Sequence, residues 1–283
     1  MRLKEEDLQT FAEWGLVQVK NLIPSALALA AKDYVYTRLS KAGLWADGQW
    51  AVAKPEEDAA WVVPDGRQKK ALSGISSSRL FKELLTPDVL AIARQLVGGE
   101  EVIPTPPHMQ FLFTPPNAQQ WRLPHSMWHI DFPRTGDVGW AGLQMFTFLQ
   151  RLEPGGGGSV VVAGSHRLLN DAGILPSKTF RRRLAREEYF RALMDKNNSD
   201  RQRFLKEVVY INDVPLKVVE LTGEPGDVYF ADLRLLHSVA PNTANLPRMM
   251  VTQRLLGASV AEQMQDVYAT VDRRRQARRE RRG

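Results

Sequence analysis

The pattern of apolar and polar residues divides the chain into a helical first third and a β-rich remainder. Apolar side chains recur at helical spacing in residues 4–14, 24–42 and 77–96, the last being two helices that meet at Pro87. A short run at residues 16–19 indicates a strand. Further along, short β-like runs alternate with proline and glycine clusters. The strands expected there cover residues 102–103, 108–114, 128–132, 143–150, 159–162, 208–211, 216–221, 228–231 and 249–256.

Many short strands separated by turn residues predict a mainly β protein with flanking helices, built as an antiparallel sandwich or barrel. We expect one domain over residues 1–283, with helices in residues 1–98 and a β-core in residues 100–260. A charged helical insertion at residues 168–207 interrupts this core. Residues 45–68 hold three tryptophans without a clear period and are expected to be irregular.

Composition narrows the class of protein. The chain is 43% hydrophobic and 25% charged, which is ordinary for a globular protein. It has no apolar run of about 18 residues, and its first residues lack the apolar core of a signal peptide, so we expect neither a membrane span nor secretion. The absence of cysteine excludes disulfides and thiolate metal sites, and it fits a reducing compartment. We therefore expect a cytoplasmic protein.

The net charge of +6 is concentrated at one end of the chain. The tail at residues 272–283 carries seven arginines against one aspartate and one glutamate, so five of the six excess positive charges are terminal. The body is thus close to neutral, which argues against a nucleic-acid-binding surface on it. A short arginine-rich end is most often a solvated, frayed helix.

The candidate chemistry centres on residues 128–133, which read WHIDFP. His129 and Asp131 are two residues apart, and on a strand such side chains point to the same face. A third ligand is expected from His237, which follows a predicted strand. Two neutral imidazoles and one carboxylate are the ligand set of non-haem Fe(II) oxygenases. A zinc site that uses three of the five histidines is the main alternative.

Arg248 follows His237 by eleven residues, after a turn at residues 245–247. An antiparallel return is expected to bring it back beside His237. A guanidinium is a permanently charged, bidentate partner for a carboxylate. This suits 2-oxoglutarate, which would chelate iron through its C1 carboxylate and 2-oxo group, leave a position for O2, and place its C5 carboxylate on Arg248. Fe(II), one aspartate and a dianionic keto acid leave a single negative charge, which Arg248 neutralises.

These residues resemble the phytanoyl-CoA dioxygenase family of Fe(II)/2-oxoglutarate-dependent oxygenases. The resemblance covers most of the chain and is most specific in WHIDFP, in GGSVVVAGSH at residues 157–166, and in GEPGDVYFADLRLLHSVAPNTANLPR at residues 223–248. It implies a double-stranded β-helix (jelly-roll, cupin-like) core with iron inside one end. By this likeness, the metal ligands are His129, Asp131 and His237, and Arg248 anchors the C5 carboxylate.

The resemblance implies further cosubstrate contacts. His108, on the strand before the metal motif, and Gln144 and Phe146, on the strand after it, match positions that face 2-oxoglutarate. Many relatives also carry a serine two residues after the distal histidine, where this chain has Val239. A second contact to the C5 carboxylate would then have to come from another hydroxyl, of which Ser238 and Thr252 are the candidates. His166 matches a structural turn of the family.

The resemblance implies oxidation of a small organic substrate by O2, with release of succinate and CO2 and with ascorbate as a candidate reductant. Related halogenases have a small residue at the position of Asp131, so a hydroxylase-type outcome is expected here, and a role in natural product biosynthesis. Two other classes stay open. A metal-dependent hydrolase on a cupin-like core would not need Arg248, and a binding protein with a vestigial site would tolerate loss of His129. The oligomeric state is not readable from the sequence.

Overall fold

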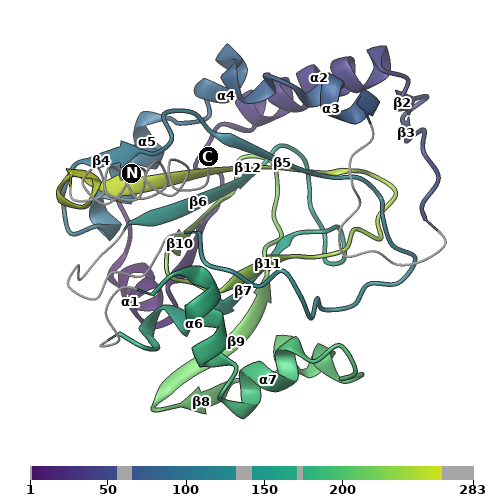
Figure 1. Cartoon of the computed structure of the whole chain (residues 1–283). Helices are drawn as coiled ribbons and strands as arrows, with labels where there is room; N and C mark the ends of the chain where they lie inside the picture. Colours follow the sequence, from purple (N-terminus) through teal and green to yellow (C-terminus); the bar gives the residue numbers. More distant parts are fainter. Residues whose placement is uncertain (1, 56–65, 132–141, 171–174, 263–283) are drawn as a thin grey trace, which may run out of the picture.

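The structure is a computed structural model that describes residues 2–55, 66–131, 142–170 and 175–262. Two antiparallel sheets form its centre (Figure 1). The larger sheet contains β1 (Leu16–Val19), β4 (Val102–Pro104), β5 (Gln110–Thr114), β6 (Leu143–Phe148), β10 (Val228–Asp232) and β12 (Arg248–Gly257). The smaller sheet contains β7 (Ser159–Ala163), β8 (Val209–Ile211), β9 (Val214–Glu220) and β11 (His237–Val239).

The strand order in both sheets shows crossovers, because most neighbouring strands are not consecutive in the chain. In the larger sheet the order is β1-β10-β6-β12-β4, with β5 pairing the first half of β12, and in the smaller sheet it is β11-β7-β9-β8. Strands that are distant in the sequence are therefore neighbours, and every pairing between them is antiparallel. The predicted jelly-roll core is confirmed.

Side-chain alternation along β6 and β12 explains how the layers pack. Phe146 and Phe148 point into the sandwich, where they pack with Met250 of β12 and Val161 of β7. The intervening residues, such as Met145, point outward and pack against the N-terminal helices. These helices are α1 (Glu5–Trp14), α2 (Ser25–Lys41), α3 (Gly66–Leu72), α4 (Arg79–Lys82) and α5 (Pro87–Leu96).

The insertion covers the outer face of the smaller sheet. It contains α6 (Ser177–Leu184), α7 (Glu188–Met194) and a 3-10 turn (Arg201–Leu205). Phe180, Phe190 and Phe204 are buried there against Leu216 and Val218 of β9. Within residues 168–207, for which the sequence predicts a helical insertion, the described helices are these three. Within the described residues, no helix is both long and apolar enough to cross a bilayer.

Three expectations about elements need correction. Residues 45–50 are not irregular, because β2 (Trp45–Ala46) and β3 (Gln49–Trp50) form a hairpin, and α3 follows from residue 66. Residues 128–131 are not a strand, because His129 makes only an isolated bridge. The strand expected at residues 108–114 begins at Gln110. Residue 132, Trp61 and the tail at residues 272–283 lie outside the described residues.

Candidate metal centre

A single antiparallel bridge brings the two histidines together. The His129 N–H donates to the carbonyl of His237 and the His237 N–H donates to the carbonyl of His129, both at 2.9 Å. The bridge lies at the free edge of β11, so that the two imidazole centroids are 4.3 Å apart. The histidines are 108 residues apart in the sequence, and the sandwich topology alone makes them neighbours.

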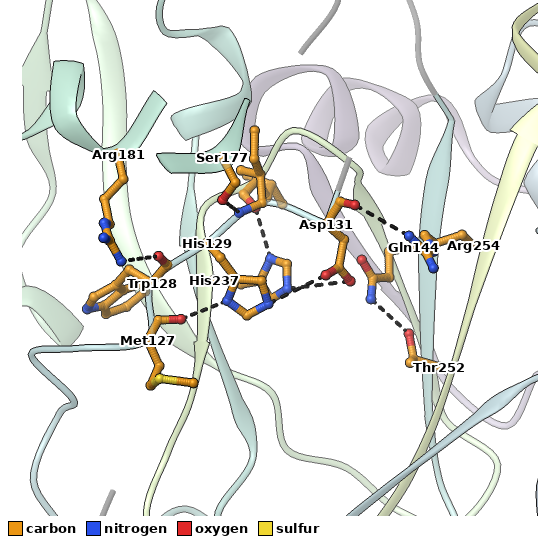
Figure 2. A network of polar contacts seen from close by, with 12 residues as sticks. Met127, Trp128, His129, Asp131, Gln144, Ser177, Arg181, His237, Thr252 and Arg254 are labelled. Atoms are coloured by element: carbon orange, nitrogen blue, oxygen red, sulfur yellow. Dashed lines mark hydrogen bonds and ion pairs between the residues drawn. The ribbon is translucent and has the colours of Figure 1, made fainter. Parts of the chain in front are cut away.

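Asp131 completes the group from two residues beyond His129. Its carboxylate oxygens lie 3.5 Å from Nε2 of His129 and 3.8 Å from Nε2 of His237 (Figure 2). One ligand atom from each of the three residues lies within 4.8 Å of the others. In the part of the chain that the structure describes, this is the one cluster of metal-binding side chains of this size. The three residues that the sequence predicts to be metal ligands therefore lie next to one another in the structure.

Both imidazoles are oriented by backbone carbonyls. Nδ1 of His129 lies 2.7 Å from the carbonyl oxygen of Met127, and Nδ1 of His237 lies 3.0 Å from that of Leu235. A ring nitrogen that faces a carbonyl carries the proton and donates it, so in the neutral rings Nε2 has the free lone pair. Both lone pairs are on the side of the Asp131 carboxylate. A histidine that binds a metal through one ring nitrogen typically donates the N–H of the other ring nitrogen to a carbonyl or a carboxylate.

Met127 holds its carbonyl in place through an unusual backbone conformation. Its φ angle is 63°, in the left-handed region that residues other than glycine, asparagine and aspartate seldom adopt. Such a conformation costs about 1–3 kcal/mol and persists where surrounding structure enforces it. The strain is adjacent to His129, whose orientation depends on it.

We expect the left-handed conformation at Met127 to be required for metal affinity. In Met127→Val the β-branched side chain disfavours positive φ, so the carbonyl turns away from His129 and metal affinity falls about 10–100-fold, as for loss of other groups that orient metal ligands. Met127→Asn is the matched control, because asparagine tolerates this conformation. Calorimetric titration with Zn(II) measures both, and equal affinities for the two variants would contradict this role.

The three side chains have different protonation behaviour. The hydrogen bond to Asp131 raises the pKa of His129, whereas burial lowers the pKa of His237. Burial also acts to raise the pKa of Asp131, but the hydrogen bond from His129 and the charges nearby outweigh it and leave the carboxyl pKa well below its usual range. The ligand-free site thus holds an ionised carboxylate next to one histidine that protonates easily and one that does not.

We expect metal binding to weaken in mild acid through His129. Protons and the metal compete for the same Nε2 lone pair, and the pKa of His129 lies above its ordinary value of 6.5. Affinity should be constant above that raised pKa and fall about tenfold per pH unit below it. Zn(II) titrations between about pH 5.5 and 8 measure the profile. An affinity that stays flat across this range would show that His129 does not ligate the metal.

The larger sheet supplies the opposite wall of the site. Phe146 of β6 contacts the ring of His237 edge-on, with centroids 6.5 Å apart. Gln144, two residues earlier on the same face, hydrogen-bonds the Asp131 carboxylate and donates to Oγ1 of Thr252 at 3.1 Å. The predicted shared face of Gln144 and Phe146 is therefore observed. Gln144 contacts a predicted metal ligand directly and is buried.

Arg248 lies at the start of β12 and points into the sandwich. It pairs with Thr114 of β5, so the expected position beside His237 on a neighbouring strand is wrong. The reason is topological: β12 joins the larger sheet and β11 the smaller one. Arg248 reaches the interior because it shares a strand face with Met250 and Thr252, which are two and four residues on.

The Arg248 side chain is buried without a charged partner. Only 3% of its surface is exposed, and burial lowers the guanidinium pKa to about 10. Within the described part of the chain, its one hydrogen-bond contact is with Sδ of Met250 at 3.9 Å, and Nε has no partner. Among the described residues no carboxylate pairs with it. A buried, uncompensated charge is costly, and it indicates that an anion completes this position.

The side chains of two other predicted contacts, His108 and Ser238, make no described contact with the triad. His108 is exposed and precedes β5, and no described contact joins it to the metal cluster. The hydroxyl of Ser238 donates to the carbonyl of Ser126 at 2.9 Å and, by alternation along β11, points away from the face of His237. His166 packs beside Gly15 with Nε2 3.3 Å from a backbone carbonyl of α1, as a structural histidine would.

Sequence reasoning missed Arg254. This side chain is half-buried, is on the inward face of β12, and donates from Nη1 to the carbonyl of Asp131 at 3.4 Å. The signal was present in the sequence, because Arg254 is six residues after Arg248 and an even spacing on one strand gives a shared face. Met127 had no such signal, since positive φ at a methionine cannot be read from residue type.

The comparisons with known proteins support the fold. No protein-family model matches the sequence. No curated protein matches it either. Among solved structures, the nogalamycin-biosynthesis enzyme SnoK, a non-heme alpha ketoglutarate dependent carbocyclase, is similar with a TM-score of 0.54 and 16% identity over 91% of this chain and 85% of that chain.

Two further structures are similar over comparable lengths. The epimerase SnoN, in complex with Fe3+, alpha ketoglutarate and nogalamycin RO, has a TM-score of 0.51 at 16% identity, covering 90% of this chain and 83% of that chain. ThoJ, a non-heme monooxygenase in complex with Ni, has a TM-score of 0.51 at 15% identity, covering 89% and 77%. Fold and site together define a jelly-roll protein with a histidine, aspartate and histidine group next to β11 of the smaller sheet and Phe146 of the larger sheet.

Proposed function

We propose that this protein is an Fe(II)/2-oxoglutarate-dependent oxygenase that hydroxylates a small organic substrate. The observation that carries the proposal is the buried, unpartnered Arg248 in the same sandwich as the triad. A metal-dependent hydrolase needs the triad but gives Arg248 no role. Membership of the phytanoyl-CoA dioxygenase family and a place in natural product biosynthesis are part of the same proposal.

The triad fits iron because of its donor atoms and because these atoms are oriented and in the protonation state that metal binding requires. Two imidazole nitrogens and one carboxylate suit Fe(II) and leave coordination positions open for other ligands. His129 and His237 offer Nε2 because their Nδ1 atoms are held by carbonyls, and Asp131 is ionised. When bound, the metal supplies the redox chemistry by which O2 converts 2-oxoglutarate to succinate and CO2 and oxidises the substrate.

Arg248 fits the distal carboxylate of 2-oxoglutarate. The cosubstrate brings two negative charges, Asp131 brings one and Fe(II) brings two positive charges, so one negative charge remains for the guanidinium. Arg248 has free donors and no competing partner among the described residues. In a buried site such a charge pair also fixes the orientation of the keto acid, because a guanidinium binds a carboxylate in a planar, bidentate manner.

The surrounding residues orient the ligands and keep water away. Gln144 hydrogen-bonds the Asp131 carboxylate and thereby limits its rotation, while Thr252 holds Gln144. Phe146 covers one side of His237. Solved structures of similar fold include a carbocyclase, an epimerase and a monooxygenase. We propose hydroxylation because the Asp131 carboxylate occupies the position that a halide would otherwise need.

The direct test is succinate release from 2-oxoglutarate in the presence of Fe(II), ascorbate and O2. Wild-type protein is expected to release succinate slowly even without a substrate, and protein stripped of metal by a chelator is expected to release none. A hydrolase would release no succinate under either condition. If the iron-loaded protein neither binds 2-oxoglutarate nor forms succinate, the proposed function is wrong.

A further inference from the structure

We propose that the substrate carries an anionic group, a carboxylate or a phosphate, which Arg254 holds beside the metal and which Arg181, on the other side of the triad, attracts from the solvent. This inference rests on the proposed function and names the substrate class for that site. Figure 2 shows the two arginines on opposite sides of the triad, Arg254 on the side of Asp131 and Arg181 on the side of His129. Neither is needed to explain iron or 2-oxoglutarate.

Arg254 is the inner of the two cations. It stands opposite Gln144 in the register of β12 and β6, and its guanidinium reaches the backbone of Asp131. That contact is a single hydrogen bond of 3.4 Å, which engages one of the five N–H donors of the side chain. No carboxylate among the described residues forms an ion pair with it. A half-buried guanidinium with free donors next to the metal cluster is a binding group for an anion.

Arg181 stands at the outer side, where the site opens. It extends from α6 and donates to the carbonyl of Trp128 at 3.4 Å, next to His129. The His129 side chain is 40% exposed and Met127 is 48% exposed, so this side of the triad is accessible from solvent. Arg181 also makes no ion pair with a described residue. The helix that carries it begins at Ser177, whose hydroxyl accepts the Ile130 N–H at 3.0 Å and so ties α6 to the metal segment.

The charge balance of the site favours an anionic ligand. With Fe(II), 2-oxoglutarate, Asp131 and Arg248 in place, the charges cancel. Arg254 and Arg181 then add two positive charges that nothing described neutralises. Arg181 is exposed and its charge is screened by water, whereas the half-buried charge of Arg254 is offset best by a bound anion. With a neutral substrate, neither guanidinium would have a counterion among the described residues.

The first experiment compares each anionic probe with a neutral probe that has the same phenyl ring. Phenylacetate with phenylacetamide and phenyl phosphate with phenol are titrated calorimetrically into anaerobic protein loaded with Fe(II) and saturated with 2-oxoglutarate. Saturation occupies Arg248, so binding reports on the remaining cations. Wild-type protein is expected to bind at least one anionic probe about tenfold or more tightly than its neutral partner. The two pairs distinguish a carboxylate site from a phosphate site.

The second experiment assigns that preference to the two side chains. Arg254→Gln should reduce the ratio of anionic to neutral binding about fivefold or more, and Arg181→Gln should reduce it less, since each variant keeps an N–H donor but loses the charge. Arg182→Gln is the matched control, because it removes an exposed arginine of the same helix. If the arginines only held the backbone of residues 128–131, the variants would weaken the binding of the anionic and the neutral probe of each pair equally.

Three results would overturn the inference. They are equal binding of the anionic and neutral probes to wild-type protein, an unchanged ratio in both variants, and a loss of 2-oxoglutarate affinity in Arg254→Gln without an effect on the ratio. The last would assign Arg254 to the cosubstrate. Failure of the proposed function is recognised separately, because 2-oxoglutarate would then fail to bind the Fe(II)-loaded wild-type protein in the preceding saturation step.

Discussion

Replacing Arg248 by methionine is expected to remove 2-oxoglutarate binding while leaving the ligand-free protein at least as stable as wild type. Breaking a buried charge pair costs about 3–5 kcal/mol, so affinity for the keto acid should fall by about 100-fold or more. Without the ligand, Arg248 is a buried cation that has no counterion in the described part of the chain. Methionine removes that desolvation penalty with similar volume, and the gain in stability should lie between zero and about 3 kcal/mol.

The opposite signs of the two effects make this variant informative. Calorimetry measures 2-oxoglutarate affinity in the presence of metal, and chemical denaturation of metal-free protein measures stability. A structural arginine would give the reverse pattern, with lower stability and an unchanged Kd for the keto acid. Arg234→Met is a useful contrast, because that side chain pairs with buried Asp232 at 2.7 Å, and its loss should destabilise the fold.

Replacing His237 by alanine is expected to abolish metal-dependent turnover. It removes a neutral imidazole whose Nε2 faces the Asp131 carboxylate and whose Nδ1 is already fixed by Leu235. Loss of groups that merely orient a ligand costs about 10–100-fold in metal affinity, so loss of a ligand itself should cost about 1,000-fold or more. The measurements are Fe(II) content after anaerobic loading and the rate of succinate release.

The control for this variant is His125→Ala, which removes a histidine outside the triad and should keep both iron and turnover. His237→Ala leaves the backbone bridge to His129 intact, so the fold is expected to remain. Wild-type turnover by His237→Ala would contradict the assignment of the metal ligands. Retention of iron with loss of turnover would instead indicate that the metal binds elsewhere.

Elements in which apolar residues repeat regularly could be predicted from the sequence, whereas the shortest strands could not. The long helix α2 and the strands β6, β10 and β12 were found because their apolar residues repeat over several turns or alternations. The two-residue strands at Trp45 and Gln49 have no period to detect, and they are fixed by packing of Trp45 on Tyr36 and of Trp50 on Phe113. The three-residue strand β11 was missed for the same reason.

The candidate site was predicted in identity but not in geometry. The two-residue spacing predicts that His129 and Asp131 point to the same face. The strand predicted there does not form, because His129 makes only an isolated bridge with His237. The eleven-residue interval between His237 and Arg248 predicts neighbouring strands, whereas the chain crosses from one sheet to the other. Sheet membership depends on long-range pairing, which local sequence patterns do not specify. The strain at Met127 is likewise set by tertiary contacts.

The most direct test of the central claim is an anaerobic crystal structure with Fe(II) and 2-oxoglutarate bound. We expect the iron on Nε2 of His129, Nε2 of His237 and the carboxylate of Asp131, with the keto acid chelated to it and its C5 carboxylate on the guanidinium of Arg248. Iron at any other position, or a cosubstrate whose distal carboxylate lies away from Arg248, would contradict the account.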